Sequence, residues 1–282
     1  MKTKIFLTLF LLSVESVYSD TPLHTHAQDL LKNEKHVMTV DVDGQKVWLK
    51  KPKNDAGNFW ACANHHMAKI LPFSMLKKSS YCTPEEYVQT ESRRLEALGA
   101  KGIPVPQVLE VNDKWLALSD AGAQLEETVS KNTNISQRKE MLLKAAAALG
   151  NVHTKGEWHG KAQLKDMTLQ DKDGIQTVGF IDLADDPSDR LSLIDCQARD
   201  VLNFSLSLMN IVDHDFETFR DVLVAYKASA PAPIWDQAIL AAERLSPYYA
   251  VMAPFSEFFG SGRAVDTSMM LEEFLKVARR EN

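Results

Sequence analysis

The stretch HTKGEWHGKAQLKDMTLQDKDGIQTVGFID, from His153 to Asp182, decides the fold. Its pattern predicts the end of a helix, a glycine-bracketed loop, a turn at Asp173-Gly174 and a strand from Ile175 to Ile181. Asp-Gly favours such a turn because both residues tolerate a positive φ. The segment therefore folds as one hairpin-like unit with a polar loop ahead of it and an acidic residue behind it.

Two acids of this unit are candidate metal ligands. Asp166 lies in the loop and Asp182 follows the strand, so we expect both at the same end of the unit. Mg²⁺ is a hard cation that takes one or two carboxylates together with phosphate oxygens. The stretch predicts a magnesium site formed by these two side chains.

The spacing of Leu149, His153, Gly156 and His159-Gly160 resembles the catalytic loop of the protein-kinase-like fold. The relatives it suggests are bacterial lipopolysaccharide-core (Kdo/heptose) kinases and small-molecule phosphotransferases. The family pattern has an Asp base two residues after the His and a metal-binding Asn seven after it. Those places hold Lys161 and Asp166 here, so the metal ligand is replaced conservatively and the base is missing. The resemblance implies a catalytic set of His159, Lys161, Lys165 and Asp166.

Upstream, Val47-Trp48-Leu49-Lys50 resembles the strand whose lysine holds the ATP phosphates in this family. A hairpin with strands 38–42 and 46–50 is expected around Asp43-Gly44.

Thr83-Pro84 begins a helix that Gly99 should end, and Glu91 lies on its apolar stripe with Val88, Leu95 and Leu98. A carboxylate on that stripe needs a cationic partner, so we expect an ion pair between Lys50 and Glu91. Alternatively, Glu91 lies at the edge of the stripe and reaches water.

The sequence ESRRLEALGAKGIPVPQV, residues 91–108, also resembles the small lobe of these phosphotransferases. Strands are expected at 107–111 and 115–118, followed by a hinge at 119–122 where Ser119 and Asp120 would meet the nucleotide. Helices follow at 136–153 and 192–209, with Asp200 facing inward to accept N–H groups of the catalytic loop, as in the family. The expected fold is α+β and two-lobed, protein-kinase-like, with a small antiparallel-sheet lobe over 20–120 and a mainly helical lobe over 121–282.

The first nineteen residues look like a secretory signal peptide. Lys2 and Lys4 precede an apolar run from Ile5 to Val14, which is shorter than the ~20 residues that a membrane span needs. An apolar first helix is the alternative. We expect export to the periplasm, with the cytoplasmic face of the inner membrane as the alternative and membrane association left open. In an exported chain Cys62 and Cys82 could pair and leave Cys196 free; three reduced thiols are equally compatible.

The net charge of −6 argues against nucleic acid as a partner. The predicted function is an ATP- and Mg²⁺-dependent phosphotransferase that acts on a hydroxyl of a sugar, a glycolipid or a small molecule. The alternative is a non-catalytic protein of the same fold (a pseudokinase) that binds or scaffolds, which the missing base, the missing glycine-rich loop and the leader favour.

Overall fold

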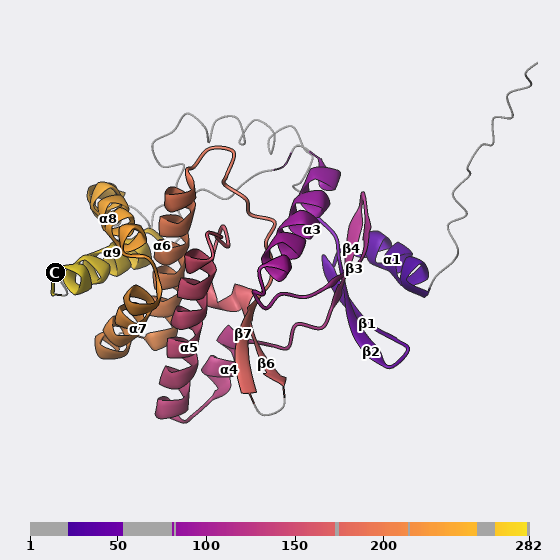
Figure 1. Cartoon of the computed structure of the whole chain (residues 1–282), viewed down its shortest axis with the longest axis horizontal. Coiled ribbons are helices and arrows are strands. Elements are labelled where there is room, and N and C mark those ends of the chain that lie inside the picture. The colour runs from indigo at the N-terminus through magenta and orange to yellow at the C-terminus, as the bar shows by residue number, and fades with distance from the viewer. Residues whose placement is uncertain are drawn as a thin grey trace, which may run out of the picture.

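The computed structural model describes residues 22–52, 81, 83–172, 175–213, 215–252 and 263–280. They form an α+β structure with a small antiparallel sheet near one end and a mostly helical remainder (Figure 1). The helices α5 to α9 gather at the end that carries the C-terminus, and α1 and α3 lie beside the sheet at the other end. The arrangement agrees with the expected α+β class.

The first sheet has the strand order β1-β2-β4-β3, and every neighbouring pair is antiparallel. Its strands are β1 (Val37–Val42), β2 (Gln45–Lys50), β4 (Trp115–Ser119) and β3 (Val108–Asn112). Asp43 and Gly44, with φ of 54° and 78°, join β1 to β2 in the conformation that a two-residue hairpin turn requires. Both expected strand pairs are confirmed.

Side chains alternate between the two faces of this sheet, as the pleat of a strand dictates. Val47, Leu49 and Trp115 are buried against α1 (Pro22–Lys32), which covers the outer face. Trp48 and Lys50, the intervening residues of β2, therefore face the other way, where both line a cavity.

Helix α3 (Pro84–Ala100) begins at Thr83, whose side chain accepts from the Glu86 N–H in a complete capping box. The expected apolar stripe is confirmed, because Val88, Glu91, Leu95 and Leu98 are all buried. The expected end of the helix is wrong. The helix continues through Gly99, and the residue beyond it with a positive φ is Gly102, at 67°.

A second, three-stranded sheet has the order β5-β6-β7 and lies between the first sheet and the helices. It consists of β5 (Ala123–Gln124), β6 (Met167–Lys172) and β7 (Ile175–Phe180), so the predicted strand exists and ends one residue early. A 3₁₀ turn, η2 (Leu164–Asp166), leads into β6. The short helix α4 (Leu125–Lys131) follows β5 and was not expected from the sequence.

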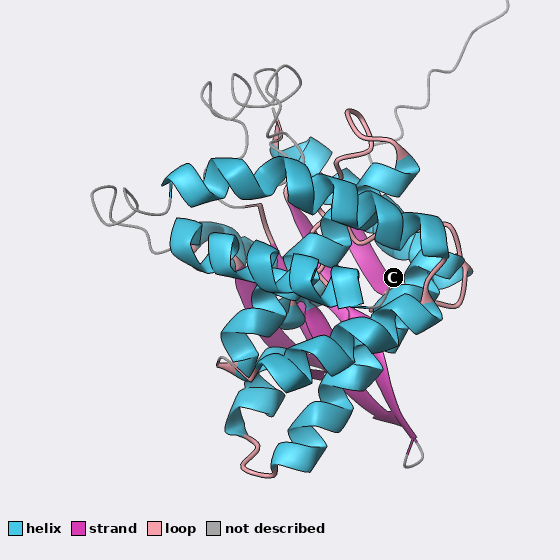
Figure 2. Cartoon of the chain, turned by 90° about the vertical axis from the view of Figure 1, so that its left-hand side faces the viewer, coloured by secondary structure: helices cyan, strands magenta, loops and turns pink. Residues whose placement is uncertain are grey.

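The helical part contains α5 (Ile135–Thr154), α6 (Leu193–Val212), α7 (Phe216–Ser229), α8 (Ala232–Met252) and α9 (Arg263–Arg280). Figure 2 shows these helices in front of the strands. Trp235 is buried, whereas Leu193, at the start of α6, is 45% exposed. Helix α8 runs through Pro247 on its exposed side, where water can satisfy the freed carbonyl.

Several expectations fall outside the described residues: the leader, the Cys62–Cys82 pair and the turn at Asp173-Gly174. Cys196 is a free thiol buried in α6. Within the described ranges no helix has the length and apolarity needed to cross a bilayer.

Candidate functional site

Lys50 lies at the centre of the candidate site, between two carboxylates. Its Nζ is 2.7 Å from Glu91 Oε1 and 2.5 Å from Asp182 Oδ1. The Glu91 side chain is 1% exposed and Lys50 is 14% exposed, whereas Asp182 is 51% exposed and faces open space. Burial disfavours the charged amine, but the two carboxylates outweigh it and raise the pKa of Lys50 well above its usual value.

Three separate elements bring these residues together. Lys50 ends β2, Glu91 lies on the inner stripe of α3, and Asp182 lies two residues beyond the end of β7. Asp182 has a φ of 62°, in the left-handed region that non-glycine residues seldom adopt. The predicted ion pair between Lys50 and Glu91 is confirmed, and the alternative of a solvated Glu91 is wrong.

The Lys50 cluster opens into a cavity of about 620 Å³, a size within the usual range for small-molecule sites. Its walls come from β2, α3, the 119–124 connection, the start of β6 and the residues after β7. The indole of Trp48 forms part of one wall, and its Nε1 donates to Asp120 Oδ1 at 2.8 Å. The sequence contained a signal for Trp48 that was missed, because residues two apart on a strand share a face and Lys50 was already a candidate.

Asp166 is a further acidic residue of the cavity wall. It is 6% exposed. Burial and the neighbouring Asp182 raise its pKa to about 7, against the opposing effect of Lys165, Lys161 and Lys50. The structure brings Asp166 and Asp182 to one cavity, where Lys50 contacts Asp182.

The loop before Asp166, residues 155–162, is anchored to α6 by Asp200. The Asp200 carboxylate accepts backbone N–H groups of His159 at 2.5 Å, Gly160 at 2.9 Å and Ala162 at 3.2 Å. His153 donates to it from Nε2 at 3.4 Å. Burial opposes ionisation, but these donors lower the pKa of Asp200 below its usual value. The predicted inward Asp200 that fixes this loop is confirmed.

The loop also depends on close packing at Gly160. Its φ is 104°, and a Cβ at this position would overlap the carbonyl oxygen of Asp185. A side chain is therefore excluded where the loop passes the segment after β7.

The other expected site residues lie in different places. Lys165 and Ser119 line the cavity, but His159, Lys161 and Asp120 are not part of its lining. His159 is buried, donates from Nε2 to the Ile181 carbonyl at 3.0 Å and packs against Phe180. Its burial lowers its pKa, so the geometry gives it a supporting position under the loop and not one facing the cavity. Asp120 bonds to Trp48 and Lys46 at the surface.

The donor set of the cavity suits a hard cation that also binds phosphate. Asp166 and Asp182 supply carboxylate oxygens, and Mg²⁺ keeps several positions for water and phosphate oxygens. In the part of the chain that the structure describes, no cluster of three or more His, Cys, Asp or Glu side chains forms a metal cage. A two-carboxylate site that is completed by a ligand fits the residues present.

No family model matches the chain. A protein of Haemophilus influenzae (strain ATCC 51907 / DSM 11121 / KW20 / Rd) is 24% identical over 224 residues, which are 79% of this chain and 83% of that protein. That relative is described as an uncharacterized protein. The functional argument therefore rests on the geometry of the site.

Proposed function

We propose that this protein is an ATP- and Mg²⁺-dependent phosphotransferase with a protein-kinase-like fold, acting on a hydroxyl of a sugar, a glycolipid or a small molecule. One observation carries the proposal: a lysine at the end of a strand is held by a buried glutamate on a helix and reaches an aspartate in the same cavity. An ion pair that only stabilised the fold would need Lys50 and Glu91 but not the half-exposed Asp182.

Lys50 is suited to hold phosphate oxygens. An ammonium group has three donors, and Glu91 fixes the side chain through one of them. The contact between Lys50 and Asp182 lies on the open side, where an anionic ligand and a cation could replace it. Glu91 thus orients Lys50, while Lys50 neutralises negative charge in the cavity.

Asp166 and Asp182 are the residues that would hold Mg²⁺. The ion, when bound, would neutralise charge on the phosphate oxygens during transfer. Lys165, which also lines the cavity, is placed to contact the same anionic groups.

Asp166 is also the residue best suited to take the proton of the acceptor hydroxyl. Lys161 stands where the family has its base, and a lysine ammonium cannot accept a proton. Without a metal ion the pKa of Asp166 is about 7, the value that favours general-base catalysis at neutral pH, so this role requires that Asp182 hold the ion while Asp166 takes the proton. General-base assistance is worth roughly 10²–10⁴ in rate. If no residue took the role of the family's base, phosphate transfer would therefore be slow but not abolished.

A second candidate is a non-catalytic protein that binds nucleotide through the same cavity. It is favoured by Lys161 at the base position and by the short contact between Lys50 and Asp182, which ties up a metal ligand. The two candidates differ in turnover and agree in binding.

The test is a thermal-shift titration of the purified protein with ATP, with and without Mg²⁺. A ligand at a hundred times its Kd stabilises a fold by ~2.7 kcal/mol, which corresponds to roughly 5–10 °C in Tm for a chain of this size. We expect this shift only with Mg²⁺ present. Asp182→Ala should abolish it, whereas Lys161→Ala should leave it intact. Unchanged Mg²⁺-ATP binding by Asp182→Ala would show that the assigned site is wrong.

Phosphate transfer to a panel of sugars and glycolipids then separates the two candidates. Turnover that is lost in Asp166→Asn, in a protein that still binds ATP, supports the enzyme. Binding without any transfer supports the second candidate.

A further inference from the structure

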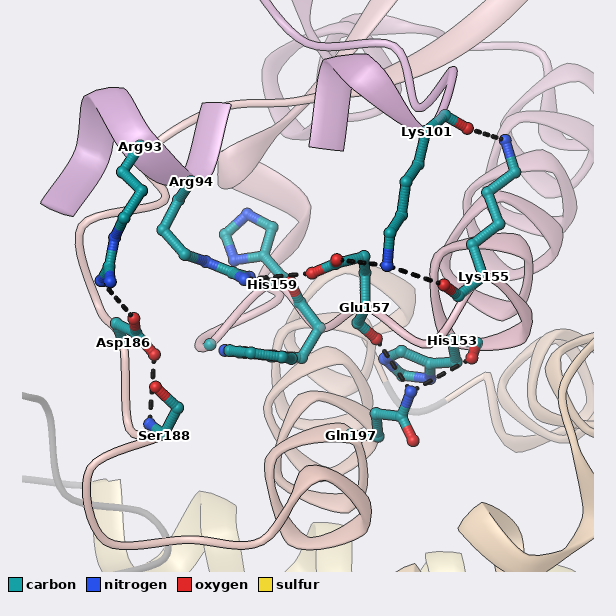
Figure 3. A network of polar contacts seen from close by, with 12 residues as sticks. Arg93, Arg94, Lys101, His153, Lys155, Glu157, His159, Asp186, Ser188 and Gln197 are labelled. Atoms are coloured by element: carbon teal, nitrogen blue, oxygen red, sulfur yellow. Dashed lines mark hydrogen bonds and ion pairs between the residues drawn. The ribbon is translucent and has the colours of Figure 1, made fainter. Parts of the chain in front are cut away.

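Helix α3 carries Glu91 into the site, and one turn later it carries a buried cation. The Arg94 side chain is 5% exposed, and its Nη1 donates to Glu157 Oε2 at 3.1 Å. Its Nη2 donates to the backbone carbonyl of Trp158, and the guanidinium lies 4.0 Å from the centre of the Trp158 ring. Figure 3 shows Arg94 reaching from the helix to the loop that contains Glu157.

A second cation, directly after α3, binds the same carboxylate. Lys101 Nζ is 2.6 Å from Glu157 Oε1, so both oxygens of Glu157 are used. Lys155 completes the junction, because its Nζ donates to the carbonyls of Lys101 at 2.7 Å and Gly102 at 3.2 Å (Figure 3). Side chains from α3 and its end thus bind the loop, and a side chain of the loop binds back to the residues that follow α3.

The loop that receives these contacts has its own anchor on α6. Gln197 Nε2 donates to the backbone carbonyls of His153 at 3.1 Å and Glu157 at 2.9 Å. Asp200, one turn further along α6, accepts three N–H groups from the same loop. Glu157 therefore joins α3 to a backbone that cannot shift without breaking several buried hydrogen bonds.

We infer that Arg94 and Glu157 are positioning residues that fix α3 against the 155–162 loop and so hold Glu91 in place to orient Lys50 in the cavity. Arg94 follows Glu91 by one helical turn, so the two move together. Loss of Glu157 would leave the buried Arg94 without its counter-ion, a strongly destabilising state, whereas loss of Arg94 would leave Glu157 with Lys101 alone.

The chain offers a matched control in the neighbouring residue. Arg93 also makes an ion pair, to Asp186 at 3.2 Å, but its side chain is 70% exposed. The Asp186 side chain is 8% exposed, but the pair lies outside the junction formed by Arg94, Glu157 and Lys101. Arg93→Gln removes a charge from the same helix without touching the buried junction.

The first measurement needs no nucleotide. The full-length protein, Glu157→Gln, Arg94→Lys and Arg93→Gln are treated with a limiting amine-acylating reagent at constant pH, and modification of Lys50 is followed by peptide mass spectrometry. The pair with Glu91 holds the Lys50 side chain at 14% exposure, so its release should open Nζ to the reagent and speed acylation severalfold. Lys131, 74% exposed on α4, serves as the internal reference.

We expect faster Lys50 acylation and faster amide hydrogen exchange in α3 for Glu157→Gln, with exchange in α6 and the Lys131 rate unchanged. Arg94→Lys keeps the charge but loses the fork geometry, so it should lie between Glu157→Gln and the parent. Arg93→Gln should match the parent. Parent-like Lys50 acylation in a folded Glu157→Gln, or in Arg94→Lys if Glu157→Gln does not fold, would overturn the inference.

The second measurement rests on the proposed function. Glu157→Gln should weaken Mg²⁺-ATP binding on the order of tenfold while Arg93→Gln does not. If the parent binds no nucleotide, the proposed function fails and the acylation result still decides the positioning role. If the parent binds and Glu157→Gln binds equally well, the positioning inference fails and the proposed function stands.

Discussion

The burial of Asp166 lowers the folding stability by an amount that depends on pH. Its pKa is about 7 in the folded protein and near 3.8 in the unfolded chain. The folded state therefore holds the proton more tightly, and folding stability falls as pH rises from about 4 to about 7. A bound cation would offset this loss, which is consistent with a ligand site that is strained when empty.

Asp166→Asn should accordingly stabilise the protein at neutral pH in the absence of Mg²⁺. A shift of about three pKa units corresponds to at most ~4 kcal/mol, and we expect a gain on the order of 1–4 kcal/mol at pH 7.5 that shrinks toward zero at pH 4. Urea unfolding at a series of pH values measures it. Asp113→Asn, in the exposed turn between β3 and β4, is the control. A gain that does not vary with pH would contradict the assignment.

Trp48 lies two residues before Lys50 and lines the same cavity. Two residues of strand span about 7 Å, which suits a ligand with a flat ring at one end and phosphate at the other. Trp48→Ala should weaken ATP binding by roughly 5- to 150-fold, because base stacking is worth about 1–3 kcal/mol. Binding of inorganic triphosphate should not change, and Trp48→Phe should retain most of the ATP affinity. Isothermal titration calorimetry gives both constants, and tighter ATP binding by Trp48→Ala would mean that the indole occupies the place of the base.

At the scale of elements, α6 organises the loop that precedes Asp166. A single fully buried carboxylate, Asp200, accepts hydrogen bonds from three backbone N–H groups of this loop that would otherwise have no partner. Such bonds to an ionised acceptor are stronger than neutral ones. The loop therefore keeps its conformation because of a helix far from it in sequence.

Asp200→Asn should destabilise the protein by about 2–4 kcal/mol at neutral pH, because an amide replaces an ionised acceptor and turns a donor toward buried N–H groups. The pKa of Asp200 is lowered on folding, so its contribution is complete above about pH 4 and is lost as pH falls below that value. Chemical denaturation at pH 7 and pH 3 should show a larger difference between parent and variant at pH 7 than at pH 3. Asp236→Asn, exposed on α8, should be neutral at both. An equal loss at both pH values would assign the effect to packing.

At the scale of the whole molecule, the cavity lies where the first sheet, α3 and the second sheet meet. None of these elements forms it alone. Residues that are distant in sequence, such as Lys50 and Asp182, become neighbours only after both sheets are in place. A ligand that bridges them would tie together both parts of the chain.

We predict that residues 1–19 are removed in the native host. The basic start and the short apolar run motivate this prediction. Intact-mass spectrometry of the mature protein should give a chain that begins at Asp20. A mature chain that begins at Met1 or Lys2 would contradict export and would place the protein in a compartment where ATP is abundant.

Local physical chemistry allowed much of the fold to be predicted from the sequence. The Asp43-Gly44 hairpin follows from turn chemistry, and the start of α3 follows from the Thr83 capping box. The inward position of Glu91 follows from the 3.6-residue period, and the pair with Lys50 follows from the cost of an unpaired buried carboxylate. Each depends on residues close in sequence or on a single long-range pairing.

Other features depended on contacts that no local pattern encodes. Helix α3 ends at Ala100, and Gly102, not Gly99, takes the positive φ beyond it, where its carbonyl accepts from Lys155. His159 looked like a catalytic residue by spacing, but packing against Phe180 and the Ile181 carbonyl buries it.

The sequence by itself thus determined the α+β class, the hairpin, the phase of α3 and the candidate acids, because propensity, capping and periodicity act over a few residues. Only the tertiary structure decided that Arg94 and Glu157 lie together, that Trp48 forms a cavity wall and that Asp166 has a pKa near 7. The physical reason is that burial, charge proximity and shape are properties of the packed chain, set by which elements meet and not by any one of them.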